Sequence, residues 1–441
     1  MGLSVGASGS ASLGDSSATA RANATGIAGG ADDDRITNTA IITAGTTSDN
    51  PDAMALAQAD STTVDVGIAV GYSNREASAN ASAFAVANAA GISGGSGNDW
   101  IDNSGAITVG PDPLGSGGMA AASGSSDAVS VTLGLGQSLG KSSSNTSSTA
   151  VANLAGISGG TGNDDVYNSG VITVGRDFSD SVEPEEAMAT AHAASETVSV
   201  TIAFGDSLSD ASSNASSTAK SSSIGIETGA GEDWIENKNN GVIRAFSSSE
   251  AVGFAKTKSV SLTVRASDGK AESNASSLST SLATGIDSGD DADEIITDSD
   301  VLVKSHAMST TLSKAENYNL LSLGSAYQSA DANSSSTAEA IARGIDGGTG
   351  GDIITAAGNY HISADTLVES TSRSSTATGF AAGENVQESQ SQAGTVSDAL
   401  AIGIDGGEGS DTITSTANLT VTTFSNADTE ATSSSNTGFN I

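Results

Sequence analysis

The chain has 441 residues and a net charge of −36 at pH 7, with 52 acidic against 16 basic residues. Nucleic acids and anionic membrane surfaces bind through Lys and Arg, so this balance argues against both as partners. Cysteine is absent and aromatic residues make up 3% of the chain, which excludes disulfides and a core of large side chains. No apolar run is long enough to predict insertion into a membrane.

The N-terminal stretch, residues 1–25, has neither a basic start nor an apolar run. We therefore expect no Sec-type signal peptide in this sequence. From residue 26 onward a glycine-rich acidic motif recurs through the chain. Its seven copies start at residues 26, 91, 156, 225, 285, 344 and 403, so the successive spacings are 65, 65, 69, 60, 59 and 59. A near-constant period over the whole chain indicates one repeat array over 1–441 rather than several domains.

The unit that starts at residue 91 illustrates the pattern inside each repeat. Residues 100–109 alternate roughly between apolar and polar, 110–127 form a variable segment, and 128–135 alternate strictly. Alternation of this kind predicts strands, and helical periodicity is weak everywhere. The sequence therefore predicts an all-β fold, a repetitive β-solenoid (β-helix) built from seven units of about 60 residues, without caps. Because such units are long for one coil, we expect two or three smaller coils per unit.

An asparagine recurs at a constant position upstream of the next Gly-Ile pair and is followed by Ser or Thr two positions later. Its copies are Asn80, Asn145, Asn214, Asn274 and Asn333. One interpretation is an internal asparagine ladder or a repeated polar turn. The other is a glycan acceptor at a repeated surface position. The ladder is favoured because the acceptor motif is common by chance in a Ser-rich chain.

Four copies of the acidic turn fit the pattern G-G-x-G-x-D-x-U-x, beginning at Gly94, Gly159, Gly347 and Gly406. In this respect the chain resembles the haemolysin-type (RTX) calcium-binding repeat. The resemblance implies that turn carbonyls and aspartates hold Ca²⁺ between coils. Carried over by position, the metal residues are Asp99, Asp164, Asp233, Asp352, Asp411, Gly95, Gly97, Gly160, Gly162, Gly348, Gly350, Gly407 and Gly409. Asp34 and Asp293 hold the same place in copies that have lost glycines.

The spacing departs from the RTX pattern, because RTX nonapeptides run in tandem and this motif occurs once per unit. A tandem β-roll is therefore not implied, and a tight Gly-Asp corner without metal is the alternative. The segment from Asn98 to Thr108, with its Asn103-Ser-Gly-Ala phrase, is also similar to coils of autotransporter and filamentous-haemagglutinin β-helices. That second resemblance implies a surface β-helix.

The chain starts and stops inside a unit. The half-units 1–25 and 403–441 have a combined length that falls within the observed range of unit lengths. The C-terminal half of one molecule and the N-terminal half of the next could therefore complete one repeat. A heterologous interface of this kind produces filaments when it does not close. The expected polymer-interface residues are Met1, Leu3, Val5, Phe439 and Ile441.

Signals for an enzyme are poor. His192, His306 and His361 lie in three different units, and we expect them to be solvated. There is no cysteine nucleophile, no G-x-S-x-G elbow and no Walker loop. Trp100 and Trp234 follow the turn aspartate in two units, where packing beside the turn is the favoured interpretation over an exposed contact.

These observations predict an extracellular or cell-surface structural protein that is not an enzyme. It would assemble head to tail with itself, with calcium as a candidate cofactor at its turns and glycans as candidate partners. The alternative is a monomeric calcium-binding surface adhesin or surface-layer segment. A polysaccharide-active enzyme is a third hypothesis, disfavoured because no unit gains a distinctive cluster. Secretion without a cleaved leader is what the RTX resemblance implies.

Overall fold

The computed structural model describes residues 3–5, 8–45, 54–111, 118–177, 187–238 and 241–440. Met1 and Ile441, two of the expected interface residues, lie outside this range. The described residues form strands joined by turns, and every strand pair is parallel. Among them there is no helix long and apolar enough to cross a membrane. The predicted all-β solenoid is confirmed.

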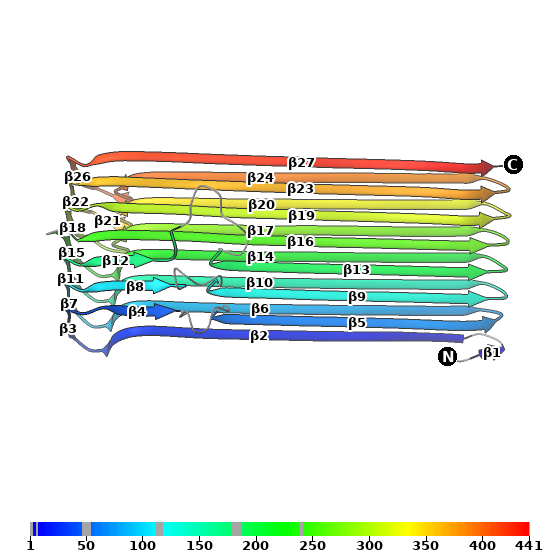
Figure 1. Ribbon diagram of the computed structural model, residues 1–441, viewed down its shortest axis with the longest axis horizontal. Coiled ribbons are helices and arrows are strands. Elements are labelled where there is room, and N and C mark those ends of the chain that lie inside the picture. The colour runs from blue at the N-terminus through cyan, green and yellow to red at the C-terminus, as the bar shows by residue number, and fades with distance from the viewer. Residues whose placement is uncertain are drawn as a thin grey trace.

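Three sheets run along the stack of coils (Figure 1). The first long sheet contains β2 (Ser8–Ala31), β6 (Ser73–Ser96), β10 (Ser138–Thr161), β14 (Ser207–Ala230), β17 (Ser267–Asp287), β20 (Ala326–Asp346) and β24 (Asn385–Asp405). The corner sheet contains β3 (Arg35–Asn38), β7 (Trp100–Asn103), β11 (Asp165–Asn168), β15 (Trp234–Asn237), β18 (Glu294–Thr297), β22 (Ile353–Ala356) and β26 (Thr412–Ser415).

The second long sheet faces the first. It contains β1 (Leu3–Val5), β4 (Ile42–Gly45), β5 (Ala55–Val70), β8 (Ala106–Gly110), β9 (Ala120–Gly134), β12 (Val171–Val174), β13 (Ala189–Ala203), β16 (Val242–Thr263), β19 (Val301–Ser322), β23 (Asn359–Ala381) and β27 (Asn418–Asn440). A short pair, β21 (Thr349–Gly350) with β25 (Glu408–Gly409), completes the arrangement.

One sequence unit makes one coil. Ser138 pairs with Ser73 on one side and Ser207 on the other, so the register advances by a whole unit per strand. The expectation of two or three smaller coils per unit is therefore wrong. The physical reason is strand length. One coil consists of a long strand, such as the 24 residues of β10, a short corner strand and a return strand in the second long sheet. These three together use the whole unit. The first three units are longer because their return strand is interrupted, as between β4 and β5, whereas β16 and later return strands are continuous.

The space between the two long sheets is filled by small side chains. Inward positions are mostly Ala, Ser, Thr and Gly, and several of the inward hydroxyls hydrogen-bond across the gap. Ser273 Oγ donates to the Ala255 carbonyl at 2.7 Å, and Ser279 Oγ donates to the Ser249 carbonyl at 2.8 Å. Such bonds offset the cost of burying a hydroxyl, so small polar residues can form this interior. The core is therefore thin, as the composition predicts.

Large apolar side chains gather instead at the corner, where three in-register rows form what we call the aliphatic column. Its rows are Ile27, Ile92, Ile157, Ile226, Ile286, Ile345 and Ile404; Ile36, Ile101, Val166, Ile235, Ile295, Ile354 and Ile413; and Ile42, Ile107, Ile172, Ile243, Val301, Tyr360 and Leu419. In the middle coils these side chains are fully buried. Burying one such side chain contributes about 1.5–3 kcal/mol, so the column is the main hydrophobic term.

The narrow gap between the long sheets predicts the effect of enlarging one inward residue. Ser277 is buried, and its hydroxyl lies 2.6 Å from the Ser309 hydroxyl of the facing sheet. Ser277→Leu should overpack the gap and lower the free energy of unfolding by about 1–3 kcal/mol, seen as a lower urea midpoint. Ser276→Leu is the matched control, because its side chain faces solvent. An equal loss in both variants would contradict the thin core.

Candidate functional site

The aspartates of the repeated turn form a continuous ladder along the stack. In each coil the Oδ1 atom accepts the backbone N–H of the aspartate in the preceding coil. The Asp99 N–H donates to Asp164 Oδ1 at 2.8 Å, and the Asp164 N–H donates to Asp233 Oδ1 at 2.7 Å. The full series is Asp34, Asp99, Asp164, Asp233, Asp293, Asp352 and Asp411. We call it the aspartate ladder; its five middle members are buried.

The motif glycines shape the turn around this ladder. Gly95 and Gly97 have φ angles of 117° and 123°, a region that side chains rarely adopt. A Cβ atom on Gly94 would collide with Oδ2 of Asp99. The residues named as calcium ligands thus have a structural role that requires no ion. The other motif glycines at positive φ are Gly160, Gly162, Gly348, Gly350, Gly407 and Gly409.

Hydrogen bonds within the turn already use part of the oxygen set that a calcium site would need. Ca²⁺ takes six to eight oxygen ligands, and each ladder aspartate except the first already uses Oδ1 to accept a backbone N–H. The turn carbonyls are used as well: Gly348 accepts the Glu408 N–H at 2.8 Å. In the part of the chain that the structure describes, no three His, Cys, Asp or Glu side chains are grouped to hold a metal ion. Calcium binding stays a prediction, and no step below depends on it.

The second oxygen of the ladder carboxyl groups is the atom most affected by burial. Oδ2 is buried without a hydrogen-bond partner in Asp99, Asp164 and Asp352. A buried charge without a partner is costly, and binding a proton removes that charge. Binding a proton at Oδ2 would therefore remove a buried, unpartnered charge in Asp164 and Asp352.

Burial raises the pKa of four of the ladder carboxyl groups. Desolvation raises the pKa of Asp164 and of Asp293 to about 7, only partly offset by the backbone N–H that each accepts. Desolvation also raises the pKa of Asp233 and of Asp352. Neighbouring carboxylates in the ladder add to the increase, because like charges oppose ionisation. Near neutral pH, part of the ladder is therefore uncharged.

This raised pKa predicts that mild acid stabilises the fold. Between the unfolded pKa of about 4 and the folded pKa of about 7, the folded state binds more protons than the unfolded chain, so stability falls as pH rises through that window. The urea midpoint measured in EGTA should be higher at pH 5 than at pH 8. The double variant Asp164→Asn with Asp293→Asn should flatten this dependence, and Asp428→Asn, at an exposed position, should not.

Calcium binding would make the fold more stable at higher pH, the opposite pH dependence, because calcium binds ionised carboxylates. If added Ca²⁺ raised the midpoint at pH 8 and the Asp164→Asn, Asp293→Asn variant lost that increase, the turns would be calcium sites. The proton-holding ladder would then be wrong.

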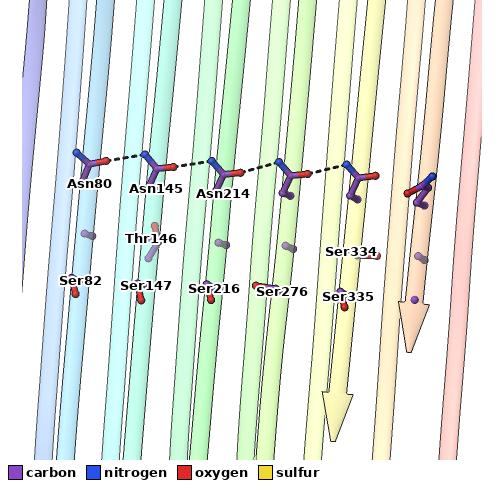
Figure 2. Close-up of a pocket in the computed structure, with 18 of the residues that line it drawn as sticks. Asn80, Ser82, Asn145, Thr146, Ser147, Asn214, Ser216, Ser276, Ser334 and Ser335 are labelled. Carbon is purple, nitrogen blue, oxygen red and sulfur yellow. Dashed lines mark hydrogen bonds between the residues drawn. The ribbon is translucent and has the colours of Figure 1, made fainter. Parts of the chain in front are cut away.

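The recurring asparagines form a second ladder on the exposed face of the first long sheet (Figure 2). Asn145 Nδ2 donates to Asn80 Oδ1 at 3.0 Å, and Asn214 Nδ2 donates to Asn145 Oδ1 at 2.8 Å. The series begins at Asp15 and continues through Asn274 and Asn333.

A row of serines runs beside this ladder. It includes Ser82, Ser147 and Ser216, and together with the asparagines it lines a shallow groove of about 1000 Å³. The geometry thus supports a ladder, but on the exposed face and not in the interior as expected, because the asparagines stand at outward positions of the strands. Glycosylation stays a prediction; a glycan would have to be attached at the Nδ2 atom that donates in this ladder.

A third ladder, which the sequence analysis did not predict, is buried at the corner. Asn38 Nδ2 donates to Asn103 Oδ1 at 2.7 Å, and Asn103 Nδ2 donates to Asn168 Oδ1 at 2.7 Å. Asn168 continues to Asn237, and Asn237 to the Thr297 hydroxyl. The signal in the sequence is an asparagine at a constant distance after the turn aspartate, inside the phrase that resembles surface β-helix coils.

The register brings together histidines that lie in different units. His306 on β19 pairs with Asp365 on β23, the strand that also carries His361. All three residues line one groove of about 770 Å³. Burial lowers the pKa of His306 to about 4, so it is not the solvated residue that we expected. His192 is exposed, although the surrounding sheet desolvates its ring enough to lower its pKa.

The two tryptophans lie beside the turn. The Arg35 guanidinium lies 4.0 Å from the centroid of the Trp100 ring, and that ring lies 5.7 Å from the ring of Tyr167. The indole N–H of Trp234 is buried. Packing beside the turn, the favoured interpretation, fits both positions.

Comparisons with known proteins assign no family: no family model, no curated protein and no solved structure matches this chain. The resemblances to RTX repeats and to filamentous-haemagglutinin β-helices therefore remain resemblances of sequence.

Proposed function

We propose that the chain is a structural protein, the subunit of an extracellular or cell-surface filament in which the last coil of one subunit stacks on the first coil of the next. The observation that carries this proposal is the open end of the aliphatic column. Ile413 and Leu419 are 46% and 47% exposed, whereas Ile354 and Tyr360, one coil earlier in the same rows, are fully buried. An exposed apolar surface of this kind favours association.

The first coil continues the three rows of the column; there Ile36 and Ile42 are buried and Ile27 is partly exposed. Ile27, Ile36 and Ile42 stand in the same three rows as Ile404, Ile413 and Leu419. Among the described strands, β2 and β24 each pair on one side only. Stacking these two edges would continue the hydrogen-bonded sheet and the column together. The interface is heterologous, so it can repeat without closing.

Polar groups also match across this joint. In the aspartate ladder each N–H donates to the next coil, so the Asp411 N–H would donate to Asp34 of the following subunit. Arg21 and Asp398 occupy the same row of the first long sheet, at its two ends. Stacking would therefore place opposite charges side by side.

Electrostatic repulsion between the acidic subunits opposes the head-to-tail contact. Residues 382–441 contain eight acidic and no basic residues. Because exposed charges are screened within about 8 Å at physiological ionic strength, salt should promote assembly. Soluble subunits at low salt and filaments at higher salt follow from this balance.

Removing apolar surface from the open end should prevent filaments. The variant Ile413→Asn with Leu419→Asn should stay as single subunits at about 0.15 M salt, as measured by light scattering after gel filtration and by negative-stain microscopy. Val396→Asn is the matched control, because this exposed side chain of the last coil is in the first long sheet, outside the column. Short rods from the unmodified chain at every salt concentration would favour the monomeric adhesin instead.

Two strands compete for one place at this joint. Ser4 of β1 pairs with Ala69, and the same row runs through the stack to Asn440. In a head-to-tail stack, β1 of one subunit and the end of β27 of its neighbour would therefore lie against the same stretch of β5. Leu3 and Val5 are on β1 and Phe439 is on β27, so three of the expected interface residues fall in this overlap. We infer that β1 leaves its position when subunits join.

Deletion of residues 1–7 should consequently speed assembly. The lag before light scattering rises should shorten, because no strand has to be displaced from β5. The control replaces residues 1–7 by Gly and Ser and keeps the chain length. It separates the loss of β1 pairing with β5 from the loss of the segment itself. Slower growth of the deletion variant would mean that β1 contributes to the joint.

A further inference from the structure

The outward face of the second long sheet carries an apolar block near the turn that leads back to the first long sheet. Three adjacent rows over the first four coils contain Val, Ile and Leu. We call this block the valine ridge; its members are Val64, Val66, Ile68, Val129, Val131, Leu133, Val198, Val200, Ile202, Val260 and Leu262. Val64 is 57% exposed, and the ridge residues of the next three coils are partly exposed.

The ridge is unusual for a chain with a net charge of −36. Its rows contain one charged residue in the first four coils, Lys258, which pairs with Val198. In the last coil two of the three rows are polar, at Ser434 and Asn436, whereas the third row carries Phe439. Across the three rows together, the apolar character is therefore strongest in the first coils. A continuous apolar patch rimmed by polar residues marks an interaction surface.

We propose that the valine ridge is a lateral docking surface for a second copy of this chain, which joins two filaments side by side. The inference rests on the proposed filament. It names a contact separate from the head-to-tail joint, because the ridge lies on a sheet face and the joint lies at the strand edges.

The size of the ridge explains why filaments, rather than single subunits, would pair. Four coils at about 4.8 Å and five residues at about 3.3 Å give a patch of roughly 300–400 Å². A stable dimer buries about 800 Å² per partner. One ridge is thus too small for a tight dimer. In a filament the ridge recurs once per subunit, and linked weak contacts add up to a strong one.

A second copy is the occupant that the chemistry favours. A face of β-branched and aliphatic side chains suits another such face, with the two sheets about 10 Å apart. Two chains of net charge −36 repel each other over most of their surfaces. At the ridge they can approach without bringing many carboxylates together, although Asp127 and Glu196 lie beside it. Higher salt should therefore also promote pairing.

The test compares two sets of three Val-to-Thr substitutions by negative-stain microscopy. Val131→Thr, Val198→Thr and Val200→Thr keep the shape of the ridge side chains and make them polar. The control set is on the outward face of the first long sheet: Val86→Thr, Val151→Thr and Val396→Thr. We expect paired filaments from the unmodified chain and the control. The ridge variant should give single filaments of unchanged length, with at least a fivefold drop in the paired fraction.

Single filaments from the unmodified chain would overturn the lateral contact, and so would a ridge variant that pairs as often as the unmodified chain. Neither result would contradict the proposed filament. If the unmodified chain forms no filaments, the proposed function fails, and sedimentation equilibrium of concentrated subunits decides about the ridge. A weak dimer that the ridge variant loses would support it, and no dimer would overturn it. Binding of unpaired chains to neutral phosphatidylcholine vesicles would assign the ridge to a lipid surface and overturn the lateral contact.

Discussion

Parallel, in-register pairing of each coil with the next is the constraint on which this structure depends. It places equal positions of successive units above one another, about 4.8 Å apart. Any residue that recurs in phase therefore becomes a row. Isoleucines become a buried column, asparagines such as Asn103 and Asn168 become hydrogen-bonded ladders, and small residues keep the long sheets close together. The core is organised along the stack axis rather than around a centre.

The same constraint forces like charges together at the turns. Asp164 cannot avoid Asp99 and Asp233, because the register fixes all three. The structure reduces the cost in two ways: each Oδ1 accepts a backbone N–H, and burial raises the pKa so that protons remain bound. Glycines at positive φ make room for these carboxyl groups. The motif is thus explained by turn geometry, whereas its resemblance to calcium-binding repeats alone would suggest an ion.

A stack of this kind has two different kinds of surface. Its ends carry strand edges that pair on one side only and, at the last coil, exposed residues of the aliphatic column; these are the surfaces of the proposed head-to-tail joint. Its flat faces are set by outward residues, which the fold leaves free to vary. The asparagine ladder occupies one face and the valine ridge the other. The proposed head-to-tail joint and the proposed lateral contact therefore rest on separate residues and can be tested separately.

The sequence by itself determined the solenoid, the number of units and the rows, because a constant period requires equal positions to stack. It predicted the asparagine ladder at Asn80 and Asn145 on the same ground. It could not determine that one unit is one coil, since a period sets the length of the repeat and not how many turns the chain makes within it. Nor could it show that Oδ1 of Asp164 accepts an N–H, or that His306 lies beside Asp365. Those facts depend on register and on which side of a strand faces a neighbour, and only the tertiary structure decides them.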